Sequence, residues 1–401
     1  MRAYVGAVKR ELAIVAHDLA PRTIFWGGGT PSLLPTKLTE ELLDAICHSL
    51  PMEKLREWTI EVNPESLTDD KARLYRERGV NRISMGVQTF DEKLLDVVGR
   101  IHSREKAIRA YGTLRAAGFD NINLDLMFGL PGQALEIWEE TLREAIALQP
   151  EHISAYCLIL EEDTEFWTAF KRGFILPNEE VETEMFKRGI EILADAGYRQ
   201  YEISNYSKPG RESQHNIAYW QGRNYYGLGP SACSTVRGSR WMNAANTDDY
   251  ITRIGRGESV RENMEELSSL VLAGERAAFG LRMMEGIDVS EFHRETGFAL
   301  AETWGKEVAD LVASGLVETC GERMRVTRRG ILFADTVAEA FVGTPAIVLP
   351  SVEAARWAHL EKVSDDWRKL ENGFCKSLIC KLPFLQKSIV GHLLDTGAGG
   401  S

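Results

Sequence analysis

Two hydrophobic patterns alternate along the first 160 residues of the chain. Short apolar runs, typical of buried strands, are separated by stretches in which apolar residues recur at helical spacing. The predicted strands cover residues 23–26, 58–62, 82–87, 122–128 and 153–160. The predicted helices cover residues 4–19, 39–50, 69–78, 91–98, 104–117 and 135–148. This alternation predicts a parallel sheet whose strands are connected by right-handed helical crossovers.

The chain is organised around residues 23–31, where the first predicted strand ends in three glycines, a threonine and a proline. Consecutive glycines remove every Cβ from the path of the backbone and allow a sharp turn. A ligand can then lie directly against backbone N–H and C=O groups. A tight turn without a ligand is an equally good interpretation of the three glycines alone.

Polar residues stand at the ends of the same strands. Glu61 lies near the end of the second strand, Gln88 ends the third, Arg100 follows the next helix, and Asp125 lies inside the fourth strand. Ligands of parallel sheets and βα barrels bind at the carboxyl ends of the strands. Each residue alone is also explained by a salt bridge, a loop anchor or a solvated charge. Together they favour a ligand that carries an ammonium, a carboxylate and vicinal hydroxyls.

The alternation weakens beyond residue 160. A helix is predicted at residues 179–196 and an alternating strand at residues 201–206. His215 follows, with Tyr219 and Trp220 close behind it in the chain. A histidine among aromatic residues can line a flat apolar pocket, although a core histidine in an aromatic cluster is the more common arrangement.

Residues 263–342 form a second predicted unit. Helices are expected at 267–279, 289–296 and 299–314, a two-stranded hairpin at 315–319 and 323–326, and a last helix from Thr327 to Val342. Three helices and a hairpin resemble a winged helix. Acidic and basic residues are balanced in this region, so we expect a packing or partner role rather than DNA binding. Residues 343–401 follow no clear period and are interpreted as an appended, partly disordered segment.

Composition excludes several classes of protein. The apolar fraction of 44% is that of a globular protein, and the formal charge of −12 argues against nucleic-acid binding. No apolar run approaches the roughly 18–20 residues of a membrane span, and the amino terminus has no secretory pattern, so we expect a cytoplasmic location. The six cysteines are scattered without tight metal-ligand spacing.

Over residues 1–342 the sequence resembles the radical S-adenosylmethionine (SAM) proteins related to oxygen-independent coproporphyrinogen III oxidase, and among them the HemW-type haem chaperones. Five motifs carry this resemblance: Gly27-Gly28-Gly29-Thr30-Pro31, Glu61-Val62-Asn63-Pro64, the stretch from Ser84 to Phe90, Gly99-Arg100-Ile101-His102, and the stretch from Asp125 to Gly132. The resemblance implies an α/β fold. It consists of a partial, TIM-like βα barrel at residues 1–210, a connecting region at 211–262 and the winged-helix-like domain at 263–342.

The resemblance also implies a SAM site. Gly28, Gly29 and Thr30 would contact the methionine part of the ligand, and Arg100 would hold its carboxylate. The remaining contacts to the amino acid and nucleoside would come from Glu61, Gln88 and Asp125, with the backbone at Ile159 beside the adenine.

His215, Asn216, Tyr219 and Trp220 match the H-N-x-x-Y-W motif of the chaperone branch. The resemblance therefore implies a haem chaperone that transfers haem to acceptor haemoproteins, and it allows transient contact with membrane proteins. His215 is a candidate iron ligand or pocket residue, and the two aromatic residues are candidates to pack on the macrocycle. Two alternatives stay open: a coproporphyrinogen III oxidase-like enzyme of porphyrin biosynthesis, and a catalytically inactive interaction protein.

One departure from the family is serious. Its [4Fe–4S] cluster is held by C-x-x-x-C-x-x-C on a loop that precedes the first predicted helix, and no such motif occurs in this sequence. A cluster needs thiolates that converge on one point. We therefore expect either an amino-terminally truncated sequence or a protein that has lost its cluster, and in both cases no oxidase activity from this chain.

Overall fold

A parallel five-stranded sheet forms the centre of the fold. The computed structural model describes residues 1–159 and 175–342 and the backbone of residues 392–395. The central strands are β1 (Pro21–Trp26), β2 (Glu57–Val62), β3 (Arg82–Gln88), β4 (Ile122–Phe128) and β5 (His152–Cys157). They are neighbours in chain order, and every adjacent pair is parallel. The predicted alternation is confirmed.

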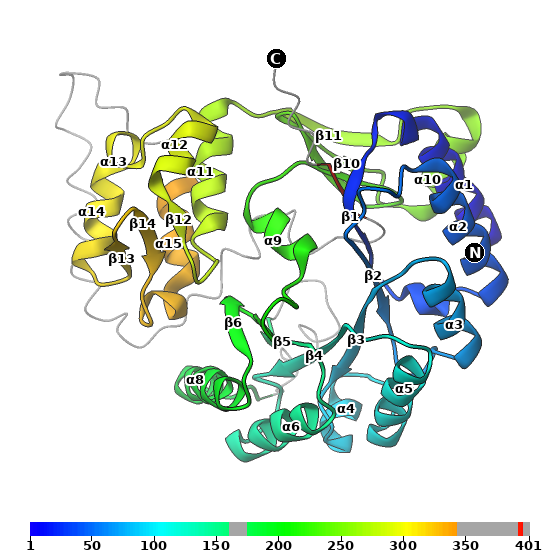
Figure 1. Cartoon of the computed structure of the whole chain (residues 1–401), viewed down its shortest axis with the longest axis horizontal. Helices are drawn as coiled ribbons and strands as arrows, with labels where there is room; N and C mark the ends of the chain where they lie inside the picture. The colour runs from blue at the N-terminus through cyan, green and yellow to red at the C-terminus, as the bar shows by residue number, and fades with distance from the viewer. Residues whose placement is uncertain (160–174, 343–391, 396–401) are drawn as a thin grey trace.

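Helices follow the outer side of this curved sheet, which is the arrangement of a partial βα barrel (Figure 1). They are α1 (Arg2–Val15), α2 (Thr36–Ser49), α3 (Asp69–Glu77), α4 (Glu92–Val97), α5 (Arg104–Ala116) and α6 (Leu135–Ala147). Local capping explains several of the starts. Thr68 and Ser103 accept hydrogen bonds from the backbone N–H groups of Lys71 and Lys106, because the first turn of a helix leaves such donors without intrahelical partners.

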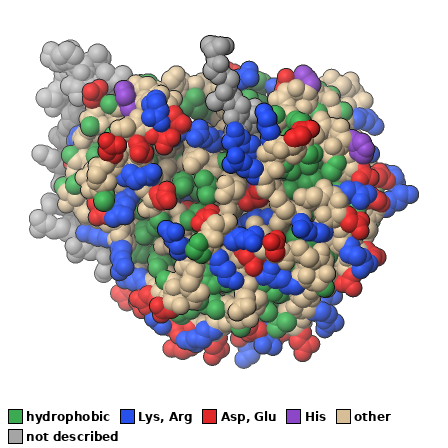
Figure 2. Space-filling view, in the orientation of Figure 1, with side chains coloured by type: hydrophobic (Ala, Val, Ile, Leu, Met, Phe, Trp, Pro, Cys, Tyr) green, Lys and Arg blue, Asp and Glu red, His purple; other side chains and the backbone are tan. Residues whose placement is uncertain are grey.

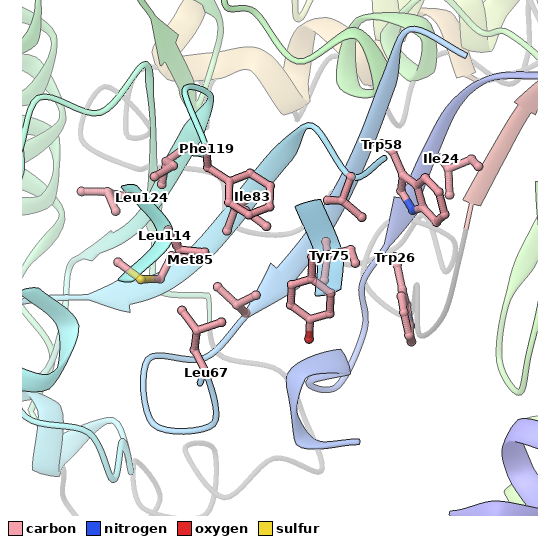
Figure 3. Close-up of a cluster of buried hydrophobic side chains, with 14 of the residues drawn as sticks. Ile24, Trp26, Trp58, Leu67, Tyr75, Ile83, Met85, Leu114, Phe119 and Leu124 are labelled. Carbon is pink, nitrogen blue, oxygen red and sulfur yellow. The ribbon is translucent and has the colours of Figure 1, made fainter. Parts of the chain in front are cut away.

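The main core lies between the sheet and its helices. Figure 3 shows Trp58, Ile83 and Leu124 from three adjacent strands, together with Tyr75 of α3 and Leu114 of α5. All five side chains have no solvent exposure. Side chains alternate between the two faces of a strand, so the strand residues next to Trp58, Ile83 and Leu124 in sequence lie on the inner, concave face of the sheet. That face is the one available for polar chemistry.

The strand predicted at residues 201–206 is wrong in one respect. After α8 (Glu179–Asp195), the chain forms two short antiparallel strands, β6 (Arg199–Glu202) and β7 (Asn205–Ser207), and β7 pairs antiparallel with β5. The Glu202 carboxylate closes the turn between them, since it accepts hydrogen bonds from the Ser204 N–H at 3.1 Å and from the Asn205 side chain.

The other edge of the sheet is extended by antiparallel strands. These are β8 (Tyr225–Gly227), β9 (Cys233–Val236), β10 (Ser239–Asn243) and β11 (Arg261–Glu266), accompanied by α9 (Gln214–Trp220) and α10 (Thr247–Arg256). The predicted connecting region therefore contributes to the same sheet as the barrel. Strand β15 (His392–Asp395) lies between β8 and β1, antiparallel to both. The rest of the predicted appended segment lies outside the described residues.

The carboxyl-terminal unit has its own core and lies beside α9 in Figure 1. Its elements are α11 (Ser269–Gly280), β12 (Ile287–Asp288), α12 (Val289–Thr296), α13 (Leu300–Thr303), α14 (Gly305–Ala313), β13 (Val317–Cys320), β14 (Arg323–Val326) and α15 (Ala334–Val342). The predicted hairpin is confirmed. The helix predicted at residues 299–314 is two helices instead, because the backbone leaves helical geometry at Trp304.

Two surface properties bear on partners. In Figure 2 acidic and basic side chains are interspersed around the rim of the visible face. Among the described residues, no helix combines the length and the apolarity that crossing a bilayer requires.

Candidate functional site

The glycine turn after β1 meets the end of β2. Gly28 and Gly29 both have positive φ angles, of 76° and 62°, which residues with a Cβ rarely adopt. The Gly28 N–H donates a hydrogen bond of 2.9 Å to a carboxylate oxygen of Glu61. The turn therefore brings the Gly28 N–H against an acidic side chain on the concave face.

Gly27 is required by this arrangement for a different reason. A Cβ added at Gly27 would lie 2.7 Å from the Glu61 carboxyl carbon and 2.4 Å from the ring of Phe25. Both distances are too short for a real side chain. The absence of a Cβ at Gly27 thus allows the Glu61 carboxylate to lie directly against the backbone.

A polar row continues from Glu61 across the next two strands. Glu61 is in register with Ser84 of β3, and the Ser84 hydroxyl donates a hydrogen bond of 3.0 Å to Asp125 of β4. The side-chain amide of Asn123 donates to Asp125 and to Ser84, at 2.7 Å in both cases. The Asp125 carboxylate is therefore fixed on the concave face by hydrogen bonds from Ser84 and Asn123.

The charged groups of this row influence one another. Burial and, to a smaller extent, the negative charge of Asp125 raise the pKa of Glu61 to about 7. Burial also raises the pKa of Asp125 and lowers that of Arg100, while the charge of Asp125 acts on Arg100 in the opposite direction. Within the described part of the chain, the Arg100 guanidinium makes no ion pair. Glu61, Asp125 and Arg100 therefore share one region of the concave face.

Gln88 joins the same region through a strained backbone. Its φ is 67°, it is 7% exposed, and the β3–β4 pairing shifts register between Gly86 and Gln88. The Gln88 amide folds back over Gly86, where an added Cβ would lie 3.1 Å from its nitrogen. Gly86 is the register partner of Asp125, so this irregularity directs the amide towards the polar row.

The two remaining SAM candidates lie at the same edge of the sheet. Thr30 precedes a short 3-10 helix, Pro31–Leu33, after the glycine turn. Ile159 is half-buried, two residues past the end of β5 and next to residues outside the described part of the chain. No contact joins either residue directly to Glu61 or Asp125 among the described interactions.

Three residues of the concave face were missed in the sequence. Ser84 and Asn123 hold Asp125, and Tyr156 of β5 is 40% exposed on the same side of the sheet. The signal for Asn123 was available, because it stands two residues before Asp125 and therefore on the same face of the strand. Ser84 depends on the pairing of β3 with β4, which single-strand patterns do not contain.

Helix α9 carries the H-N-x-x-Y-W motif and is fastened to the start of β2. The buried Glu57 carboxylate accepts hydrogen bonds from the backbone N–H groups of Gln214, at 2.9 Å, and His215, at 3.0 Å. The Glu57 carboxylate also accepts a hydrogen bond of 3.2 Å from the Ser213 hydroxyl. The Ser213 hydroxyl oxygen caps the helix, because it accepts a hydrogen bond from the Asn216 N–H. Negative charge at a helix amino terminus is favourable, since unpaired N–H groups converge there.

The imidazole of His215 faces the barrel. It is 6% exposed, its Nδ1 lies 3.1 Å from the Thr23 hydroxyl, and its ring stacks on Phe25 with a centroid distance of 5.0 Å. His215 therefore packs against the concave side of β1.

The aromatic half of the motif faces the carboxyl-terminal unit. Tyr219 contacts the rings of Tyr225 and Phe279, with centroid distances of 5.2 and 6.0 Å. Trp220 also contacts Phe279, and the Arg282 guanidinium lies 4.9 Å from its ring centroid. Three motif residues are thus divided between two surroundings: the barrel for His215, and the helix α11 for the aromatic pair. The fourth, Asn216, is half-buried in the first turn of α9.

The described residues do not fit an iron–sulfur cluster. No group of three histidine, cysteine or acidic side chains in the described ranges is arranged to hold a metal ion. The four described cysteines lie on four separate elements, at positions 47, 157, 233 and 320. Cys375 and Cys380 lie outside the described residues.

Comparisons with known proteins agree with the fold and with the two units. The Radical SAM superfamily model matches residues 5–145, and the HemN C-terminal domain model matches residues 267–333. The structure of coproporphyrinogen III oxidase (HemN) from Escherichia coli superposes with a TM-score of 0.73 at 23% identity, covering 84% of this chain and 82% of that one. This similarity establishes the fold.

Full-length relatives define the branch of the family. The "Heme chaperone HemW" of Bacillus subtilis is 35% identical, over 85% of this chain and 91% of the relative. The protein of the same name from Escherichia coli is 36% identical, over 80% and 84%. A mitochondrial radical S-adenosyl methionine domain-containing protein of Mus musculus is 30% identical, over 84% and 77%. The chain therefore belongs to the HemW family within the radical SAM superfamily.

Proposed function

We propose that this protein is a haem chaperone, which binds haem and transfers it to acceptor haemoproteins, built on a barrel that binds SAM. Two lines of support meet here. The relatives that match most of the chain are called haem chaperones, and the motif helix α9 joins the barrel to the carboxyl-terminal unit. The observation that carries the proposal is the position of Tyr219 and Trp220, whose rings lie together at the junction of the two units.

The concave polar row fits SAM. A half-buried Arg100 without an ion pair in the described part of the chain suits the ligand carboxylate, because a guanidinium binds a carboxylate through two parallel hydrogen bonds. The Glu61 and Asp125 carboxylates suit an ammonium and ribose hydroxyls, and the backbone of residues 27–29 is bare enough for close approach. Bound SAM would bring an activated adenosyl group to this face. Since the described residues offer no cluster ligands, no reductive cleavage is assigned to the chain.

His215 has two candidate roles, as an iron ligand and as a residue that positions α9. The second role is supported by its burial and by its contacts with Thr23 and Phe25. Ligation would require a ring nitrogen to reach the iron, and Nδ1 already lies 3.1 Å from the Thr23 hydroxyl. A cytoplasmic location stays a prediction. The oxidase alternative is not proposed, because the similarity to HemN supports only the fold.

Haem binding is tested by titrating the full chain with haemin and following the Soret band. We expect saturable binding by the wild-type protein and transfer of the bound haem to apomyoglobin as acceptor. Without a Soret shift the proposal fails. His215→Ala separates the two roles of the histidine: loss of a low-spin spectrum with retained affinity indicates ligation, whereas weaker binding with an unchanged spectrum indicates positioning.

SAM binding is tested separately by equilibrium dialysis. Asp125→Asn removes one charge from the concave row, and Asp96→Asn is the matched control because Asp96 is exposed on α4. We expect at least a tenfold loss of affinity in the first variant only. Equal affinities in both variants would refute the assignment of the concave row to SAM.

A further inference from the structure

A cavity of about 320 Å³ lies where α9 ends against the carboxyl-terminal unit. Its walls come from the end of α9, from the β9–β10 hairpin and from helices α11 and α12. The lining residues that matter here are Tyr219, Arg223, Arg237, Arg240, Arg276 and Phe279. We call this cavity the arginine cleft. It contains one residue of the H-N-x-x-Y-W motif and is separate from the concave polar row of the barrel.

The arginine cleft carries an excess of positive charge. Its lining includes four arginines and two glutamates, although the chain as a whole has a formal charge of −12. One arginine is neutralised at the bottom, where Arg240 and Glu275 form a buried two-bond ion pair. The other glutamate, Glu295, is shared, because it pairs with both Arg223 and Arg276. Two positive charges therefore remain without a carboxylate of their own.

Two further observations suggest that the excess positive charge of the arginine cleft favours a bound anion. Burial lowers the pKa of Arg276, and the neighbouring charge of Arg223 lowers it further, so one shared carboxylate, Glu295, serves two close guanidiniums. Arg237 stands at the β9–β10 turn with a positive φ of 51°, exposed and without an ion pair among the described residues. A bound anion beside these arginines would balance the positive charge that Glu295 and Glu275 leave over.

The cleft also has an aromatic side. The Tyr219 ring packs at 40° to that of Tyr225 and at 35° to that of Phe279, so three aromatic rings pack together here. Tyr219 and Phe279 both line the cavity. A ligand that suits this cleft therefore combines two negative charges at one edge with a flat apolar body.

We infer that the arginine cleft receives the two propionate groups of haem, with the edge of the macrocycle against Tyr219 and Phe279. The inference rests on the proposed function. Both propionates project from the same edge of the ring system, so two carboxylates reach the cleft together. A cavity of this volume, at the lower end of small-molecule sites, accommodates that edge and leaves the rest of the macrocycle over α9. Guanidiniums are suited to the task because they bind carboxylates with two hydrogen bonds.

The test uses the full chain and two probes, haemin and haemin dimethyl ester, whose propionates are uncharged. We expect the wild-type protein to bind haemin at least tenfold more tightly than the ester. Arg237→Glu should weaken haemin binding at least tenfold and leave ester binding unchanged. Arg256→Glu makes the same charge change at an exposed position of α10, outside the cleft, and should leave both affinities unchanged.

Arg223→Gln provides a second variant with a smaller change. It should weaken haemin binding severalfold, again without an effect on the ester, and circular dichroism spectra report whether each variant is folded. If the wild-type protein binds haemin and both cleft variants bind it equally well, the propionate site is refuted and the chaperone proposal stands. If the wild-type protein gives no Soret shift, the chaperone proposal fails and the propionate site fails with it.

Discussion

The carboxylate of Glu61 makes the stability of the barrel depend on pH in an unusual direction. Burial and the charge of Asp125 raise its pKa from 4.5 to about 7. The folded protein therefore binds more protons than the unfolded chain between these two values. Since stability falls with pH wherever the folded state holds the extra proton, the free energy of unfolding should decrease from about pH 4.5 to pH 7.

The size of this effect follows from the shift. Each pKa unit corresponds to about 1.4 kcal/mol, so the ionised Glu61 costs about 3 kcal/mol of stability above pH 7. Glu61→Gln removes the charge and keeps an oxygen that can accept the hydrogen bond from the Gly28 N–H. We expect the variant to match the wild-type protein at pH 5 and to be more stable by about 3 kcal/mol at pH 8.

Urea denaturation at pH 5, 6, 7 and 8, followed by tryptophan fluorescence, measures this difference. Other buried acids titrate in both proteins, so only the difference between the two curves reports on Glu61. Glu65→Gln is the control, because Glu65 is exposed just beyond the same strand. A constant difference between wild type and Glu61→Gln across the pH range would show that Glu61 is not desolvated and would refute the reasoning.

Three further changes test the packing around the two sites. Gly27→Ala should lower the free energy of unfolding by about 1–3 kcal/mol and abolish SAM binding, because the new Cβ displaces Glu61. Gly112→Ala is the control: this glycine is in an open position of α5, so the added methyl group should raise the free energy of unfolding by about 0.5–1 kcal/mol. Glu57→Gln should cost about 1–3 kcal/mol in thermal or urea denaturation, because one buried N–H of α9 loses its acceptor. Arg240→Met should cost about 3–5 kcal/mol by leaving Glu275 buried and unpaired, and the double variant with Glu275→Leu should recover most of it in a double-mutant cycle.

The parallel part of the fold was predictable because its information is local. Each strand is a buried apolar run, and each crossover helix has an apolar face of the right period. The predicted bounds of β4 and α12 agree with the structure to the residue. The same pattern implied that the carboxyl ends of the strands lie at one edge, which is why Glu61 and Asp125 could be selected before their contacts were known.

The elements that were missed depend on distant partners. Strands β8 to β11 are short, and the sequence does not tell which neighbours they pair with. The split of the predicted strand at residues 201–206 depends on a side chain, because Glu202 closes the turn. The arginine cleft was not predictable for the same reason: Arg223 and Arg276 are far apart in the chain, and the fold brings both of them to Glu295.

Strand β1 connects the candidate SAM site to the motif helix over a few residues. Gly27 and Gly28, at its end, contact Glu61, and Phe25, two residues earlier, stacks on His215. Phe25 also closes the space beside Gly27, so the ring cannot move without affecting both neighbours. Helix α9 then carries the connection from His215 to Tyr219 and the arginine cleft. The burial of His215 is thus best understood as a structural link: it fixes one end of α9 to the barrel, so that the other end presents Tyr219 to the cleft at a constant position.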